Sequence, residues 1–123
     1  MPSETLALSC HCGNIAIRAN HRPATLTQCN CSICRRYAAL WGYFFEDEVI
    51  ITEGDLGSSY YSWGDRILRF VRCNGCGCMT HHILVDKTMP PKLGVNFRMA
   101  EADLVDALPV RHFDGAESWK FFD

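Results

Sequence analysis

The chain has 123 residues, 48% of them hydrophobic, which is enough to bury the core of one domain over residues 1–123. Twelve basic and fourteen acidic residues give a net charge of −2, which excludes the basic footprint of a nucleic-acid-binding protein. The sequence contains no apolar run of about 18 residues and begins with no basic and apolar leader pattern, so we expect a cytoplasmic protein without membrane contact.

Short strand patterns separated by turn residues follow one another along the chain. Either apolar–polar alternation or a high density of β-branched and aromatic residues predicts each of them. The predicted strands are residues 14–18, 25–28, 40–45, 49–52, 60–63, 67–72, 79–85 and 93–97. We expect one helical turn at 35–39, a two-residue hairpin turn at Gly64-Asp65 and a short helix at 101–108. This pattern predicts a mainly β fold.

Eight cysteines fall into three tight groups, which are the strongest chemical signal in the chain. A short CxC or CxxC loop can aim two thiolates at one metal ion, about 2.3 Å from each sulfur. In a reducing cytosol such groups favour a metal site, with zinc as the first candidate, over a disulfide framework. The groups are Cys10 and Cys12, then Cys29, Cys31 and Cys34, then Cys73, Cys76 and Cys78.

The outer groups supply four thiolates from distant parts of the chain. Because four sulfurs complete a tetrahedral shell, a zinc bound by them would need no external ligand and would be structural. The alternative is that these are ordinary buried cysteines, which are common in protein cores. The predicted ligands are Cys10, Cys12, Cys73 and Cys76.

The middle group, Cys29, Cys31 and Cys34, offers three sulfurs and no evident fourth protein ligand. Three protein ligands plus an exchangeable position is the arrangement of a reactive zinc site. Three thiolates leave the complex negatively charged, which weakens zinc as a Lewis acid and favours sulfur chemistry over hydrolysis. We expect this zinc to be only partly occupied in purified protein. The alternative is a second structural zinc whose fourth ligand comes from elsewhere in the chain.

The combined spacing resembles that of the glutathione-dependent formaldehyde-activating enzyme family, which belongs to the centromere protein V superfamily. The resemblance rests on CxC at 10–12, CxCxxC followed by two arginines at 29–36, and CxxCG at 73–77. It spans residues 8–119, including His112-Phe113-Asp114-Gly115 and Trp119 near the end.

The resemblance implies a β-tent fold of short antiparallel strands organised around zinc. It also implies a structural zinc on the outer cysteines and a catalytic-type zinc on the middle ones. The implied activity is that of a carbon–sulfur lyase, which adds the thiol of glutathione to formaldehyde and gives S-hydroxymethylglutathione. A small-molecule thiol and an aldehyde would then be the partners.

Two positions depart from the family pattern. Cys78 stands where a small or hydroxyl residue is common, and it could pack, approach a metal or complete the middle site. Ala39 stands where a glycine is usual after the arginine pair, and this could tighten the neighbouring loop.

Further side chains near these motifs have a functional and a structural interpretation. Arg35 and Arg36 could bind a carboxylate of glutathione or a similar thiol, or could simply balance the charge of the site. His81 and His82 are adjacent on a strand, so at most one of them faces a site, and His11 is expected to be a loop residue. An apolar pocket beside the middle site could be walled by Trp41, Tyr43, Phe44 and Phe45, although a core role is favoured.

Three functions fit these observations. The first is a zinc-dependent enzyme of the carbon–sulfur lyase type, with Cys29, Cys31 and Cys34 holding the reactive zinc. The second is a non-enzymatic binding module that two structural zinc ions hold together. The third is a redox or zinc-buffering role, in which Cys78 is an exchangeable thiol.

Overall fold

The computed structural model describes residues 5–86 and 88–123. It confirms a mainly β fold built from short strands. The strands are β1 (Leu6–Ser9), β2 (Ile15–Ala19), β3 (Leu26–Cys29), β4 (Trp41–Phe45), β5 (Val49–Glu53), β6 (Ser58–Tyr61), β7 (Leu68–Cys73), β8 (Met79–Leu84), β9 (Lys92–Asn96) and β10 (Val110–Phe113). The helices are α1 (Ser32–Tyr37) and α2 (Ala102–Ala107), with 3-10 turns η1 (Glu46–Glu48) and η2 (Phe97–Met99). Within the described ranges, no helix is long and apolar enough to cross a membrane.

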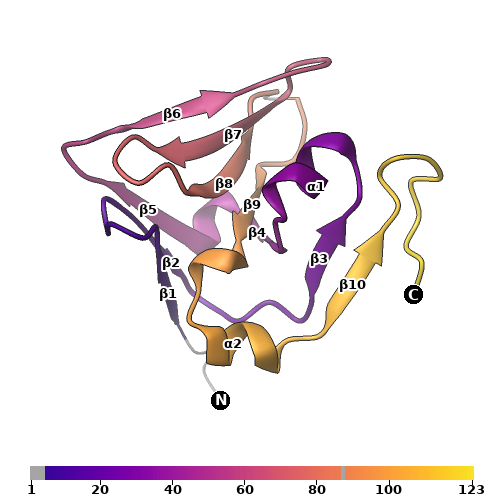
Figure 1. The fold of residues 1–123 in the computed structure, drawn as a ribbon, viewed down its shortest axis with the longest axis horizontal. Helices are drawn as coiled ribbons and strands as arrows, with labels where there is room; N and C mark the ends of the chain where they lie inside the picture. The colour runs from indigo at the N-terminus through magenta and orange to yellow at the C-terminus, as the bar shows by residue number, and fades with distance from the viewer. Residues whose placement is uncertain (1–4, 87) are drawn as a thin grey trace.

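The strands form two sheets (Figure 1). One has the order β1-β2-β5, and the other has the order β10-β3-β4-β9-β8-β7-β6. Neighbouring strands pair antiparallel in the described part of the chain, except that β10 runs parallel to β3. A parallel pair needs a long connection, and here most of the large sheet lies between the two strands in the sequence. The C-terminal strand is thereby placed beside β3, which ends at the middle cysteines.

Two hydrophobic cores lie on opposite faces of the large sheet, because side chains alternate along each strand. Phe44 joins the larger core, which includes Ile17 of the small sheet and Val95. Trp41 joins a smaller core with Phe70 and with the middle cysteines beside α1. The core role favoured for the four aromatic residues is therefore confirmed for Trp41 and Phe44, whereas Tyr43 and Phe45 are exposed.

Most of the predicted strands are confirmed to within two residues, but three local features differ. The link between β6 and β7 runs over residues 62–67, so the two-residue turn at Gly64-Asp65 is wrong, although the two strands do pair. The helical turn predicted at 35–39 begins earlier, at Ser32, because the Cys31 side chain caps it. The sequence analysis missed β1 and β10, which take their place by pairing with β2 and β3.

The adjacent histidines of β8 are both buried. Burial lowers the pKa of each, His81 and His82, to about 4, so both imidazoles are neutral near pH 7. The His82 ring packs against Trp41 at 4.5 Å between centroids, and it occupies the space that a β-carbon on Gly94 would need. Neither histidine joins a cysteine cluster.

Candidate metal centres

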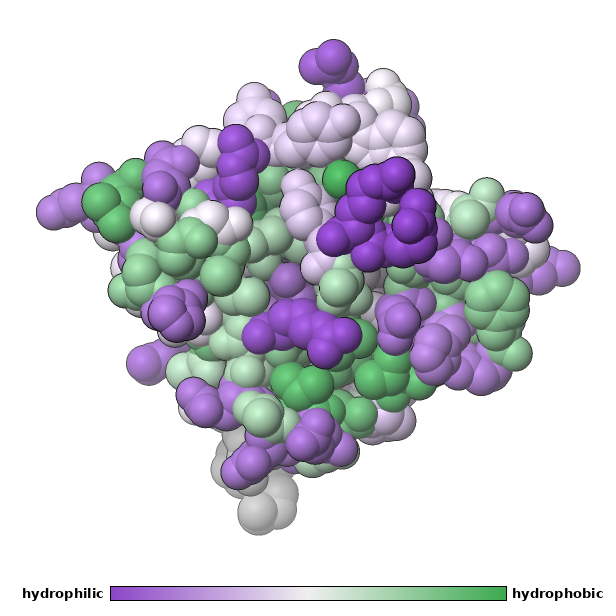
Figure 2. All heavy atoms as spheres, in the orientation of Figure 1, coloured by the Kyte–Doolittle hydropathy of each residue, from purple (hydrophilic) through white to green (hydrophobic). Residues whose placement is uncertain are grey.

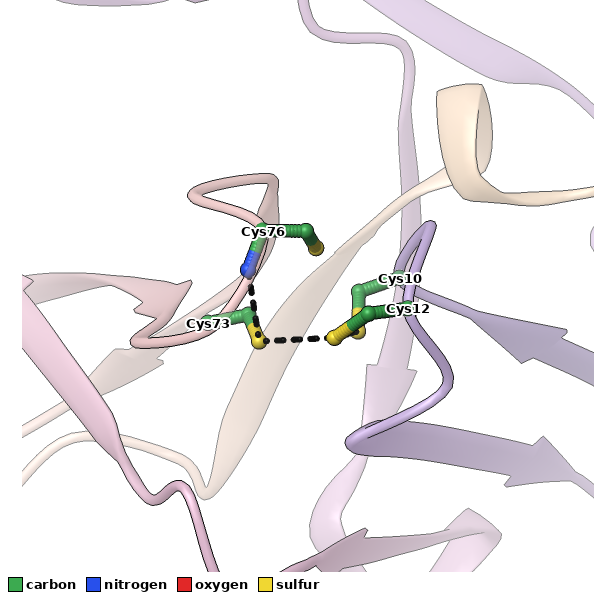
Figure 3. Close-up of side chains that lie close together, drawn as sticks. All are labelled: Cys10, Cys12, Cys73 and Cys76. Carbon is green, nitrogen blue, oxygen red and sulfur yellow. Dashed lines mark hydrogen bonds between the residues drawn. The ribbon is translucent and has the colours of Figure 1, made fainter.

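The outer cysteines meet in one cluster, which we call the first cluster (Figure 3). Cys10 and Cys12 lie in the loop after β1, and Cys73 and Cys76 lie at the β7–β8 loop. Their four sulfurs all lie within 4.8 Å of one another, with 3.8 Å from Cys10 to Cys12 and 3.5 Å from Cys12 to Cys73. Tetrahedral zinc with bonds of about 2.3 Å would space its sulfurs by about 3.8 Å. The first cluster therefore fits zinc.

Hydrogen-bond donors around the first cluster point at its sulfurs. The backbone N–H of Ile15 donates to Cys10 Sγ at 3.3 Å, and the N–H of Gly75 donates to Cys73 Sγ at 3.2 Å. The β7–β8 loop also needs Gly75 for space, because a β-carbon there would lie 2.5 Å from Leu56 Cδ1 and 3.1 Å from Cys12 Sγ. Donors of this kind orient thiolate ligands and stabilise their charge.

The thiols of Cys12 and Cys76 in the first cluster differ in how readily they ionise. The N–H groups of Cys78 and Cys12 lower the pKa of Cys76 to about 5. The Asn14 N–H also lowers the pKa of Cys12, but contacts with Cys73, burial and the other cluster thiols outweigh it and raise that pKa to about 11. A bound dication would remove this difference, because a metal-bound thiol is held as the thiolate.

Cys78 lies beside the first cluster rather than at the middle site. The His11 N–H donates to its sulfur, whereas burial and the neighbouring Cys76 thiol act the other way and raise its pKa. Cys78 therefore does not complete the middle group, and the position that the sequence left open in that group is not filled by this thiol.

The middle cysteines form the second cluster, with all three sulfurs within 4.8 Å of one another. Cys29 ends β3, Cys31 caps α1, and Cys34 lies in its first turn. The Cys34 N–H donates to Cys31 Sγ at 3.4 Å, so the start of the helix itself aims these sulfurs together. Within residues 5–86 and 88–123, no fourth His, Cys, Asp or Glu joins them. The second cluster could hold a metal ion and leave one coordination position for another ligand.

Ionisation within the second cluster is also unequal. Hydrogen bonding from Cys34, together with the N–H groups of Cys31 and Gly115, lowers the pKa of Cys29 to about 5. The same contact with Cys29, and then burial, strongly raises the pKa of Cys34. Because three thiolates repel one another in a buried place, this arrangement also suits a cation.

The indole of Trp41 is a functional contact that the sequence analysis missed. Its Nε1–H donates to Cys34 Sγ at 3.4 Å, and both side chains are buried. The sequence of residues 40–45 predicted only a strand rich in aromatic residues. No motif in that segment indicates a contact with Cys34, seven residues before Trp41. This hydrogen bond would orient Cys34 and reduce its charge in the metal complex.

Trp41→Phe is expected to weaken metal binding at the second cluster about tenfold and to leave the first cluster unchanged, because an outer donor to a ligand is lost while most of the packing remains. Competition with a chromophoric zinc chelator would measure both affinities. The matched control is Phe70→Leu, which alters the same small core without removing a donor to sulfur. An equal loss in both variants would show that packing, not the N–H donor, is responsible.

The turn after β10 covers the second cluster. Asp114 accepts hydrogen bonds from Asn30 Nδ2 at 3.0 Å and from the Ser118 N–H and hydroxyl at 3.0 and 2.8 Å. These contacts hold Gly115 against Cys29, where a β-carbon would lie 2.5 Å from Cys29 Sγ. Trp119 closes the same turn by packing on Phe113. Asp114 and Trp119, to which the sequence assigned no chemistry, thus position the backbone around a candidate ligand.

A cavity of about 430 Å³ adjoins Cys29 and Cys34. Arg35 lines it, whereas Arg36 donates from Nη1 to the Ser32 carbonyl at 2.8 Å and is not a lining residue. The sequence analysis assigned both arginines the same candidate role, but the structure places Arg35 at the cavity and Arg36 outside its lining. The other lining residues are Gln28, Asn30, Ala38, Ala39, Arg98, His112, Phe113 and Phe122.

Comparisons with known proteins agree with this geometry. The model of the family described as glutathione-dependent formaldehyde-activating enzyme matches residues 5–112. The crystal structure of a Rhodobacter sphaeroides protein is similar to this chain, with a TM-score of 0.68 and 25% sequence identity. The similarity covers 85% of this chain and 99% of that one. The comparison with curated proteins found no match.

Proposed function

Because this chain belongs to the glutathione-dependent formaldehyde-activating enzyme family, we propose that it is a zinc-dependent enzyme that adds a glutathione-like thiol to a small aldehyde such as formaldehyde. The product with glutathione would be S-hydroxymethylglutathione, and the reaction type is that of a carbon–sulfur lyase running in the direction of addition. The proposed first-cluster zinc is structural, and the proposed second-cluster zinc is the reactive one.

One observation carries the proposal: the second cluster has three sulfurs, lacks a fourth protein ligand among the described residues and adjoins a cavity. A closed structural site would have four protein ligands, as the first cluster does. A three-ligand site beside a space of about 430 Å³ has room for a small thiol.

The proposed reaction conserves atoms and electrons without an oxidant. The thiol loses its proton, its sulfur forms a bond to the carbonyl carbon, and the carbonyl oxygen gains a proton to become a hydroxyl. Zinc held by Cys29, Cys31 and Cys34 would stabilise the thiol in its ionised form. Trp41 and Gly115 hold two of these ligands in place through N–H donors, and the cavity would position the aldehyde beside the sulfur.

The proposal also places the enzyme in the cytoplasm as a single β-tent domain. All eight cysteines are free thiols, and a reducing compartment would keep them available for metal. The first cluster joins two loops that are far apart in sequence, which supports a fold organised around zinc.

The test is to measure zinc content, glutathione binding and exchange between glutathione and S-hydroxymethylglutathione on one wild-type sample. We expect up to two zinc ions per chain and bound glutathione. With ¹³C-formaldehyde, nuclear magnetic resonance spectra should show faster exchange than in the same mixture without the protein. Two zinc ions with neither binding nor faster exchange would contradict the proposal, and would favour a zinc-scaffolded binding module instead.

A further inference from the structure

Basic side chains line the cavity beside the second cluster. Arg35, Arg98 and His112 line it, and none of its lining residues is acidic. Figure 2 shows strongly hydrophilic side chains over α1 and in the region between α1 and α2 on this face. The two guanidinium groups on this lining favour an anionic group on the part of a ligand that lies beside them.

Two hydrogen bonds hold the exposed Arg98 at the edge of this cavity. Its Nε donates to the Ala38 carbonyl at 2.9 Å, and its backbone N–H donates to Asn96 Oδ1 at 3.1 Å. Asn96 is buried and donates in turn to the Met79 carbonyl at 2.8 Å. These contacts hold both ends of Arg98 but use only Nε of its guanidinium, and no described residue accepts from its Nη atoms.

Arg35 approaches the cavity from α1, one residue after the candidate ligand Cys34. Its backbone N–H donates to the Cys31 carbonyl, so the position of this residue is fixed by the same helix turn that gathers the cysteines. Arg35 is exposed and lines the same cavity as Arg98.

His112 is less suited to anion binding because a carboxylate already pairs with it. Its Nδ1 lies 2.9 Å from Asp123 Oδ2, and its backbone N–H donates to Asp123 Oδ1 at 3.0 Å. The two arginines are therefore the cavity cations without an acidic partner among the described residues.

We propose that Arg98, together with Arg35, binds a carboxylate of the thiol substrate and thereby selects anionic thiols over neutral ones. A guanidinium pairs with a carboxylate through two parallel N–H donors, and a guanidinium already held by one contact loses little freedom on binding. This inference rests on the proposed function, since it requires a thiol at the second cluster. Arg98 is a specificity residue in this role and takes no part in bond making.

The test uses protein in which Co²⁺ replaces zinc, because thiol binding then changes the visible absorption spectrum. Two probes of similar size are titrated: 3-mercaptopropionate, which carries a carboxylate, and 2-mercaptoethanol, which is neutral. We expect the wild type to bind 3-mercaptopropionate more tightly. Arg98→Gln should weaken that binding about tenfold and leave 2-mercaptoethanol unchanged. The control is Arg18→Gln, which removes an exposed arginine on β2, away from the cavity.

The outcomes separate this inference from the proposed function. If the wild type binds both thiols equally, or if Arg98→Gln weakens both equally, thiol binding at the metal stands and carboxylate recognition by Arg98 is overturned. If neither thiol changes the spectrum, the proposed function fails and the inference fails with it. Arg98→Lys keeps the positive charge but lacks the paired donors, and intermediate affinity for 3-mercaptopropionate alone would support the paired contact.

Discussion

Cys73→Ser is expected to unfold the protein. Cys73 ends β7 and contacts Cys12, which lies 61 residues earlier, so the first cluster joins the small sheet to the large one. A structural zinc site contributes on the order of 10 kcal/mol to folding in small zinc-dependent peptides. The free energy of unfolding of a whole domain is about 5–15 kcal/mol, so losing the site removes most of it. Far-ultraviolet circular dichroism and thermal unfolding would measure the loss.

Cys78→Ser is the matched control for this variant. It removes a thiol that neighbours the first cluster but lies outside its four-sulfur set. We expect this control to stay folded and to keep its zinc. The Cys73→Ser variant could instead unfold cooperatively, with a midpoint temperature within a few degrees of that of the wild type. In that case the first cluster does not hold a structural zinc.

Cys31→Ser is expected to abolish aldehyde–thiol exchange while the protein remains folded. The second cluster would keep two of its three sulfurs, and its zinc should be lost on dialysis. Helix α1 should persist, because serine is a favourable N-cap residue and can accept the Cys34 N–H as Cys31 does. The measurements are zinc content, expected to fall to the first-cluster ion, together with glutathione binding and the exchange rate.

Ser32→Ala provides a control beside Cys31, since it changes an exposed residue of α1 that is not a candidate ligand. It should keep both zinc ions and the exchange activity. Two outcomes for Cys31→Ser count against the proposal. Retention of the second zinc would remove Cys31 from the ligand set, and unfolding like that of Cys73→Ser would make the second zinc structural.

The cysteine spacing was sufficient to predict which neighbouring sulfurs lie together, whereas joining the two outer pairs into one cluster followed from the four ligands that a closed zinc shell needs. A CxC or CxxC segment brings its own sulfurs close together whatever the rest of the fold does, so Cys29, Cys31 and Cys34 needed little more than the start of α1. Alternation along single strands also predicted the mainly β class. These are local properties, and they can be deduced from residues that are near one another in the chain.

The surroundings of the second cluster could not be deduced in this way. Trp41 contacts Cys34 of α1 from β4, Asp114 contacts Asn30 across 84 residues of sequence, and Arg98 contacts Ala38 across 60 residues. No sequence pattern encodes these distances, because they depend on the order of strands in the sheet. The parallel pairing of β10 with β3 shows this most clearly, since it brings the Asp114 turn to the cluster.

The sequence by itself therefore determined which side chains can bind metal and which family they resemble, because short spacings restrict where those side chains can lie. Only the tertiary structure decided that Cys78 belongs beside the first cluster, that Arg35 and Arg36 diverge, and that Arg98 lines the cavity. The physical reason is that sheet pairing and core packing bring distant residues together, and both depend on the whole chain.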